Sequence, residues 1–124
     1  MKTKRPKNLN LFTIHFPIPS IVSILHRISG VILFLLIPLM LWVLNSSLSS
    51  EEGFNNLAQF LATPWVKFVL WGVLSALIFH FVAGIRHLLM DINIGIELKS
   101  GRFSSILTII VALILILLTG VWLW

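Results

Sequence analysis

The chain contains no cysteine. It therefore forms no disulfide, binds no iron–sulfur cluster or metal through thiolates, and attaches no haem through a Cys-x-x-Cys-His motif. Charged residues are scarce too: they make up 10% of the 124 residues, whereas 58% are hydrophobic, and the mean hydropathy is +1.04. A soluble domain is far more polar than this. We therefore expect one small membrane domain covering residues 1–124.

Acidic residues are also few, with four against nine Lys and Arg, which gives a formal net charge of +5. A basic chain can bind nucleic acid. In a membrane protein, however, an excess of Lys and Arg is typical of the segments that stay in the cytoplasm. We therefore expect no nucleic-acid partner.

Three long apolar stretches dominate the chain, at about residues 20–44, 64–90 and 103–124. Each is long enough to cross a hydrocarbon core of about 30 Å as a helix. The fold class predicted is all-α: an integral membrane protein with three transmembrane helices running up, down and up. Pro38 is expected to kink the first helix unless neighbouring groups compensate for the missing hydrogen bond. Residues 45–59 are interpreted as a polar loop, and the third span as facing lipid.

The remaining segments suggest turns and a membrane surface. Residues 1–10 are basic, as at the start of a signal peptide, but no small-residue cleavage site follows the first apolar run, so we expect them to be retained. Pro17 and Pro19 oppose a helix running through them, which favours a short interfacial segment at about residues 11–19. Asn93 and Gly95 can adopt the left-handed conformation that ends a helix.

The distribution of basic residues predicts the orientation. The N-terminal segment carries four of them, and the loop after the second span carries Lys99 and Arg102, whereas the first loop has none. The positive-inside rule therefore puts the N-terminus and the second loop in the cytoplasm, and the C-terminus in the periplasm.

Ionisable residues gather at the end of the second span, where each costs several kcal/mol in a bilayer. A helix turns about 100° per residue, so Gly84, His87 and Asp91 all lie within about 40° of His80 on one stripe. Arg86 points elsewhere. Two imidazoles, a carboxylate and a glycine on one face predict a surface for a flat cofactor with polar edges.

A second polar stripe is predicted on the first span. Ser23, Arg27 and Gly30 are spaced i, i+4, i+7, and His26 flanks them. Antiparallel spans bring this stripe to the same depth as His80, so we expect one site. Arginine side chains in a span can instead extend toward lipid headgroups. For Arg27 we favour a functional role. For Arg86 both a functional role and contact with headgroups or anionic lipid stay open.

Haem is the flat cofactor that we expect, because an imidazole can be an axial ligand of its iron. Packing and proton relay remain alternatives for His80 on the residues alone. Two axial ligands approach from opposite faces, so His80 and His87, about 10.5 Å apart along one helix, cannot both bind one iron. His26 is the only internal candidate for the opposite ligand, and a partner chain is the better one. Gly84 would give the macrocycle clearance.

Three motifs make the chain resemble the cytochrome b556 membrane-anchor subunits of bacterial succinate dehydrogenase. They are Arg5-Pro6, Ser23-x-x-His26-Arg27-x-Ser29-Gly30 and His80-x-x-x-Gly84-Ile85-Arg86-His87-x-x-x-Asp91. Their spacing covers nearly the whole chain. Lys7 and Asn93 depart from the family pattern, and both lie outside the expected site.

The resemblance implies specific roles. His80 would be an axial ligand of haem b, with the opposite ligand supplied by a second small membrane-anchor subunit. Ser23 and Arg27 would line the ubiquinone site. His26, Arg27 and His87 would lie near the haem propionates. The resemblance implies no role for Asp91.

The resemblance also implies an assembly: a succinate:ubiquinone oxidoreductase in the bacterial inner membrane, in contact with phospholipid. Its flavoprotein subunit would oxidise succinate, its iron–sulfur subunit would pass electrons on, and this chain would anchor both. The anchor of a related fumarate reductase is an alternative. A cofactor-free scaffold or a small transporter is another, although a proton-coupled exporter needs an acidic residue deep in its spans, and none lies deeper than Asp91.

Overall fold

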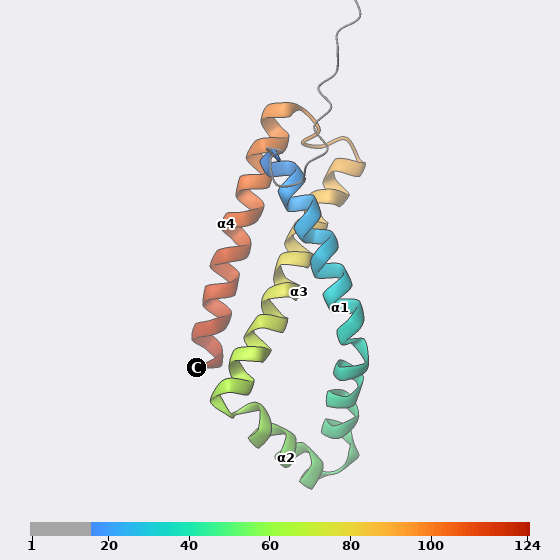
Figure 1. Cartoon of the computed structure of the whole chain (residues 1–124), viewed down its shortest axis with the longest axis vertical. Helices are drawn as coiled ribbons and strands as arrows, with labels where there is room; N and C mark the ends of the chain where they lie inside the picture. Colours follow the sequence, from blue (N-terminus) through green and yellow to red (C-terminus); the bar gives the residue numbers. More distant parts are fainter. Residues whose placement is uncertain (1–15) are drawn as a thin grey trace, which may run out of the picture.

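The computed structural model describes residues 16–124, and every regular element in this range is a helix. Three long helices, α1 (Ile18–Ser49), α3 (Pro64–Asp91) and α4 (Leu98–Leu123), lie side by side and alternate in direction (Figure 1). The short α2 (Glu51–Leu61) joins α1 to α3 at one end. Each long helix is long and apolar enough to span a membrane. The predicted all-α fold with three spans is confirmed.

Helix α1 extends beyond its predicted range of 20–44 at both ends. Pro17 has an extended backbone at the N-cap, and Pro19 lies in the first turn, where a helix needs no N–H group. The helix continues through Pro38 without interruption. The predicted interfacial segment lies mostly outside the described residues, as does the Arg5-Pro6 motif.

The predicted polar loop at residues 45–59 is wrong, because α1 continues to Ser49 and α2 follows almost at once. Ser50 caps α2 by accepting a hydrogen bond from the N–H of Gly53 (2.9 Å). Glu51 and Glu52 occupy the first turn, where carboxylates complement the positive end of the helix dipole. A serine N-cap followed by two acidic residues is a helix-start signal. The polarity of residues 45–59 had suggested a loop instead.

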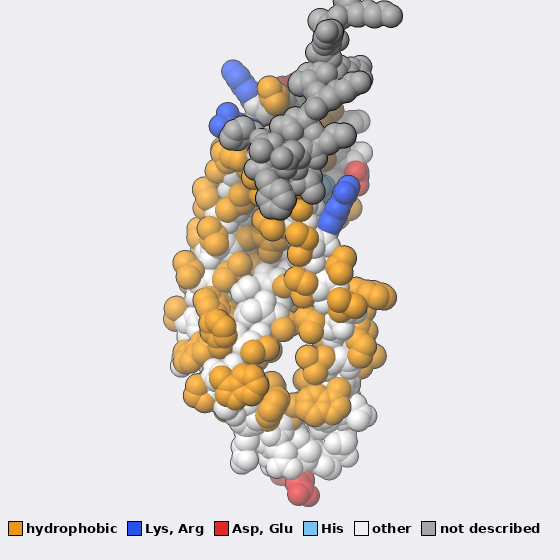
Figure 2. Space-filling model, viewed as in Figure 1, with side chains coloured by type: hydrophobic (Ala, Val, Ile, Leu, Met, Phe, Trp, Pro, Cys, Tyr) orange, Lys and Arg blue, Asp and Glu red, His pale blue; other side chains and the backbone are white. Residues whose placement is uncertain are grey.

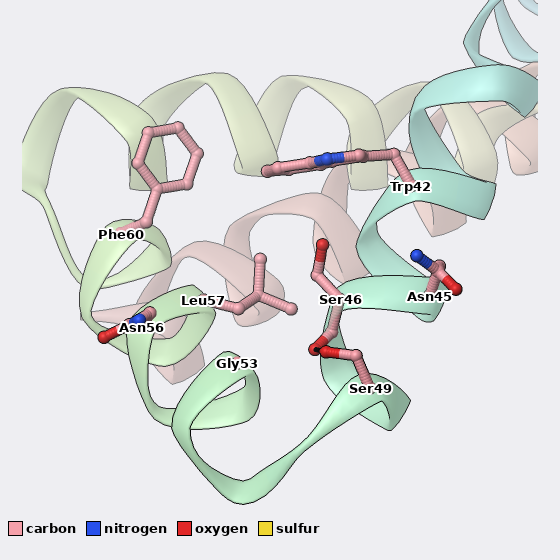
Figure 3. A pocket seen from close by; sticks show the side chains of 8 residues that line it. All are labelled: Trp42, Asn45, Ser46, Ser49, Gly53, Asn56, Leu57 and Phe60. Atoms are coloured by element: carbon pink, nitrogen blue, oxygen red, sulfur yellow. Dashed lines mark hydrogen bonds between the residues drawn. The ribbon is translucent and has the colours of Figure 1, made fainter.

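Helix α2 folds back against the end of α1 around a cavity of about 290 Å³ (Figure 3). Leu57 is buried at this corner, and the rings of Trp42 and Phe60 meet edge to face at 6.5 Å. A Cβ atom at Gly53 would lie 2.5 Å from Oγ of Ser49, so the close approach of the two helices requires glycine there.

The turn between α3 and α4 matches its prediction. Asn93 and Gly95 both have positive φ angles, 64° and 75°. The left-handed conformation at these two residues ends α3 and reverses the chain. Helix α4 then begins at Leu98, earlier than the predicted residue 103.

The interpretation of the third span as lipid-facing is correct for only part of α4. Its buried residues are small and recur at helical spacing: Gly101, Ser105, Thr108 and Ala112. Lipid supplies no hydrophobic force that drives helices together, so membrane helices associate through close van der Waals packing. Small residues allow that close approach. Further along the interface, the indole N–H of Trp71 donates to the carbonyl of Ile116 (2.8 Å), and the ring lies against Gly120.

Hydrophobic side chains cover the flanks of the bundle, whereas charged side chains gather toward its two ends (Figure 2). Many of these apolar side chains are more than half exposed, including Phe34, Leu35 and Phe81. An exposed apolar surface of this extent is stable only against lipid or another membrane subunit. The side chains are therefore distributed as in a membrane protein: small and polar residues lie between the helices, and large apolar residues lie outside.

Candidate functional site

Three histidines meet where α1 crosses α3. The imidazole rings of His26 and His80 stack with their centroids 4.3 Å apart and an interplanar angle of 6°. The ring of His87 lies 4.8 Å from that of His26, tilted by 45°. The histidine that flanks the predicted stripe of the first span thus meets the two histidines of the second, and we call these three residues the histidine cluster (His26, His80 and His87).

Glycines make the histidine cluster possible, because α1 and α3 each contribute a glycine that leaves room for a histidine of the other helix. A Cβ atom at Gly30 of α1 would lie 3.1 Å from Cε1 of His80 on α3. A Cβ atom at Gly84 of α3 would lie 3.4 Å from Nε2 of His26 on α1. Each histidine thus lies over the glycine of the opposite helix. The clearance at Gly84, expected for a macrocycle, is taken by His26 instead.

Hydrogen bonds define which nitrogen of His80 is available. The hydroxyl of Ser29 donates to the carbonyl oxygen of His26 (2.8 Å), so its oxygen is left as an acceptor. Nδ1 of His80 lies 3.1 Å from this hydroxyl oxygen and 3.2 Å from the same carbonyl oxygen. A carbonyl oxygen can only accept, so these contacts favour the tautomer with the proton on Nδ1. Nε2 therefore keeps its lone pair and can bind a metal ion.

The stacking of His26 on His80 bears on whether His26 could be the opposite axial ligand to His80. Two axial imidazoles on one iron point their nitrogens at each other across the porphyrin plane. In this chain the two rings lie face to face in contact, with no space for a macrocycle between them. His26 is therefore not the opposite ligand to His80 in this arrangement.

The donor atoms of the cluster nevertheless match the chemistry of a haem. Nδ1 of His80 is anchored on α1, as the second nitrogen of a metal-binding histidine usually is. Nε2 of His87 is buried and has no hydrogen-bond partner within residues 16–124, which suits an acidic edge group such as a propionate. The same residues contain no group of three or more His, Asp or Glu placed to hold a bare metal ion.

The other predicted site residues lie around this cluster. Ser23 is half-buried on α1, one turn before His26 and Arg27. Arg27 itself is exposed, so its guanidinium is accessible to a partner molecule. Asp91, the last residue of α3, is exposed as well.

Arg86 points away from the histidine cluster, as the helical angle predicted. It does not extend toward headgroups, however, since only 4% of its surface is exposed. Its Nε donates to Oγ of Ser104 (3.1 Å), and one terminal nitrogen lies 3.5 Å from the carbonyl oxygen of Gly101. Snorkelling of Arg86 out of the bundle is wrong, because α4 supplies polar partners inside it. Contact with an anionic lipid, the other alternative, stays open.

Sequence reasoning gave no role to Ser29, which holds His80, or to Ser104, which holds Arg86. Ser29 stands one turn after His26 and beside Gly30, and this placement on the polar face was the available signal. Nothing local identified Ser104, because its importance depends on which face of α4 meets α3.

Comparison with known proteins points to one family. A family model described as "Succinate dehydrogenase/Fumarate reductase transmembrane subunit" matches residues 1–119. The chain is 46% identical, over the full length of both chains, to the succinate dehydrogenase cytochrome b556 subunit of Coxiella burnetii. It is 34% identical to the subunit of that name from Rickettsia felis, over 95% of this chain and 92% of the relative. A succinate dehydrogenase hydrophobic membrane anchor subunit of Halobacterium salinarum is 30% identical over 78% of each chain.

Proposed function

Because the chain belongs to the succinate dehydrogenase/fumarate reductase transmembrane subunit family, we propose that it binds haem b and helps form a ubiquinone-reduction site. Membership already makes it an integral membrane subunit of an oxidoreductase complex. The proposal adds what its side chains do there. The observation that carries it is the anchoring of His80 Nδ1 by Ser29 and the His26 carbonyl, which leaves Nε2 for a metal ion.

His80 would be the axial ligand of haem b from this chain. Bound haem b supplies a one-electron redox centre within the membrane. His87, His26 and Arg27 would orient its propionates, and Nε2 of His87, buried without a hydrogen-bond partner among residues 16–124, supports this role. The opposite ligand would come from a second small anchor subunit, and the stacking of His26 against His80 supports this choice over His26. The relatives named cytochrome b556 subunits support the haem assignment.

Ser23 and Arg27 would bind ubiquinone on the same end of α1. The Ser23 hydroxyl can donate a hydrogen bond to a quinone carbonyl oxygen. The Arg27 guanidinium is permanently charged and would stabilise the negative charge that develops on that oxygen as electrons arrive. Both residues lie within one turn of His26, and Arg27 is exposed, as a substrate contact requires.

The proposed assembly places electron entry at the end of the bundle that carries Ser23 and the α3–α4 turn. Lys99 and Arg102 are exposed there, whereas Glu51 and Glu52 are exposed at the α2 end. The positive-inside rule supports an inner-membrane protein with its N-terminus in the cytoplasm and its C-terminus in the periplasm. A flavoprotein and an iron–sulfur subunit would dock on the cytoplasmic end, and the flavoprotein would oxidise succinate.

The fumarate reductase alternative shares the family model, whose description includes both enzymes. The relatives named above are all subunits of succinate dehydrogenase. The succinate-oxidising assembly is therefore the better supported of the two.

The quinone assignment is tested by measuring two activities of the same purified complex. In the purified complex, Arg27→Leu should lower succinate:ubiquinone reductase activity by about a hundredfold, because a charge that stabilises the developing oxyanion is lost. Succinate oxidation measured with an artificial acceptor that takes electrons from the soluble subunits should stay unchanged. Arg102→Leu removes an exposed charge from the same end of the bundle and should affect neither activity. Equal loss of both activities in Arg27→Leu, or ubiquinone reduction that survives it, would contradict the assignment.

A further inference from the structure

A second cavity lies between α3 and α4, on the side of α3 that carries Arg86 rather than the histidine cluster. Its volume is about 390 Å³. Its lining is apolar apart from Arg86 and Ser104, which meet at one end, and Thr108 one turn further along α4. The proposed haem and quinone contacts use other residues, so this cavity has no role in the function proposed above.

Arg86 is an unusual residue at this depth. Only 4% of its surface is exposed, and Nη1 is buried without a hydrogen-bond partner within residues 16–124. The partners that it does have are a hydroxyl of Ser104 and a carbonyl of Gly101, neither of which carries a charge. A buried guanidinium without a counter-charge is costly, and all its N–H groups are donors. An anionic oxygen from outside the chain would both neutralise it and satisfy Nη1.

The rest of the cavity indicates what the anion is attached to. Ile85, Leu107, Val111 and Leu115 line it, and each is at least 36% exposed on the outer surface of the bundle. The lining on α4 extends from Ser104 to Leu115, which corresponds to about 16 Å of helix. Arg86 lies five residues before the end of α3, about 8 Å below that end. The cavity thus combines a cationic end near the membrane surface with an apolar slot that runs toward the interior.

We propose that this cavity binds one membrane phospholipid, with its phosphodiester oxygen on Nη1 of Arg86 and an acyl chain along α4. Two other occupants match only half of the cavity. A carboxylate from a partner subunit would pair with Arg86 and leave the apolar slot empty. A quinone would fill the slot but carries no negative charge for the guanidinium.

The test counts phospholipids that remain on the intact complex. The complex would be purified in detergent, washed in graded steps and examined by native mass spectrometry. We expect the wild type to retain one phospholipid per copy of this chain after annular lipid is removed. Arg86→Gln should lower the occupancy at least tenfold. Val111→Phe, which fills the slot without touching Arg86, should do the same.

Matched controls separate this site from general effects. Arg102→Gln removes an exposed charge near the same end of α4, and Leu113→Phe enlarges a side chain that is 54% exposed outside the cavity. Both should retain the phospholipid. Arg86→Lys keeps the charge and should restore part of the occupancy.

Two results would overturn the proposal: a phospholipid count unchanged by both Arg86→Gln and Val111→Phe, or bound quinone lost in Val111→Phe in place of phospholipid. The haem spectrum of each variant is recorded in parallel and should match the wild type. Failure of the lipid site and failure of the haem assignment are thereby distinguished.

Discussion

The two sides of α3 use similar packing for opposite chemistry. Toward α1, the rings of His80 and His87 pack against His26, His80 and His26 each lie over a glycine of the opposite helix, and the ring of His80 is held through Nδ1. Toward α4, Arg86 is held by a hydroxyl and a carbonyl. In both places small residues let a neighbouring helix approach, and α-helical backbone or hydroxyl groups orient a large polar side chain.

The two sides differ in the atom that the anchored side chain leaves available to a ligand. Anchoring His80 through Nδ1 leaves a lone pair on Nε2, which suits a cation such as haem iron. Anchoring Arg86 through Nε leaves an N–H donor on Nη1 without a partner among residues 16–124, which suits an anion. On the two proposals made above, one helix would present a metal-binding face and an anion-binding face to different neighbours.

The largest effect expected from disturbing only the α1 side comes from Gly30→Val. Its Cβ atom would lie 3.1 Å from Cε1 of His80, and the branched side chain would displace that ring. Overpacking of this kind costs about 1–3 kcal/mol, so haem content per purified complex should fall about tenfold. Gly72→Val is the matched control on α3, since a Cβ atom at Gly72 meets nothing within 4 Å. Full haem content in Gly30→Val would show that His80 need not occupy its observed position.

A smaller effect is expected from Ser29→Ala, which removes one of two acceptors around Nδ1 of His80. Outer partners of metal ligands typically contribute 10–100-fold to metal affinity, and the remaining His26 carbonyl should keep the loss below that range, at about threefold. Haem retention during a detergent wash would measure it, together with the midpoint potential. Ser29→Thr keeps the hydroxyl and should behave as wild type. Equal losses in the two variants would implicate packing instead of the hydrogen bond.

The smallest effect should appear on the α4 side, in Trp71→Phe. This change removes the 2.8 Å hydrogen bond from the indole to the Ile116 carbonyl, worth about 1 kcal/mol. The Tm of the complex should fall by a few degrees while the haem spectrum stays unchanged. A loss of haem without a change in Tm would mean that the two sides of α3 are coupled more strongly than the packing indicates.

Periodicity predicted the side chains that share each face of α3, and the structure agrees for His80, Gly84 and His87. It also predicted that Arg86 points away from them. These predictions succeed because helical angles are local and depend on sequence alone. The ends of the spans were less well predicted, since the polar residues 45–59 concealed the cap and first turn of α2.

Contacts between helices could not be predicted in the same way. Arg86 is buried because Gly101 and Ser104 of α4 face it, and no local pattern in α3 reveals that. Gly84 was expected to give clearance to a macrocycle, whereas the structure has His26 against it, because that contact depends on how α1 crosses α3. The depth of a side chain and the helix face on which it lies can be predicted from the sequence of one helix. The residues that it contacts on a neighbouring helix depend on how all three long helices pack.

The central claim is that His80, held through Nδ1, is this chain's ligand to haem b, and a difference spectrum tests it most directly. Dithionite-reduced minus oxidised spectra would be recorded for the purified complex as wild type, His80→Ala and His26→Ala. The account predicts a b-type α-band in the wild type, its loss in His80→Ala, and a weakened but present band in His26→Ala. A band that is unchanged in His80→Ala, or that is absent from the intact wild-type complex, would contradict it.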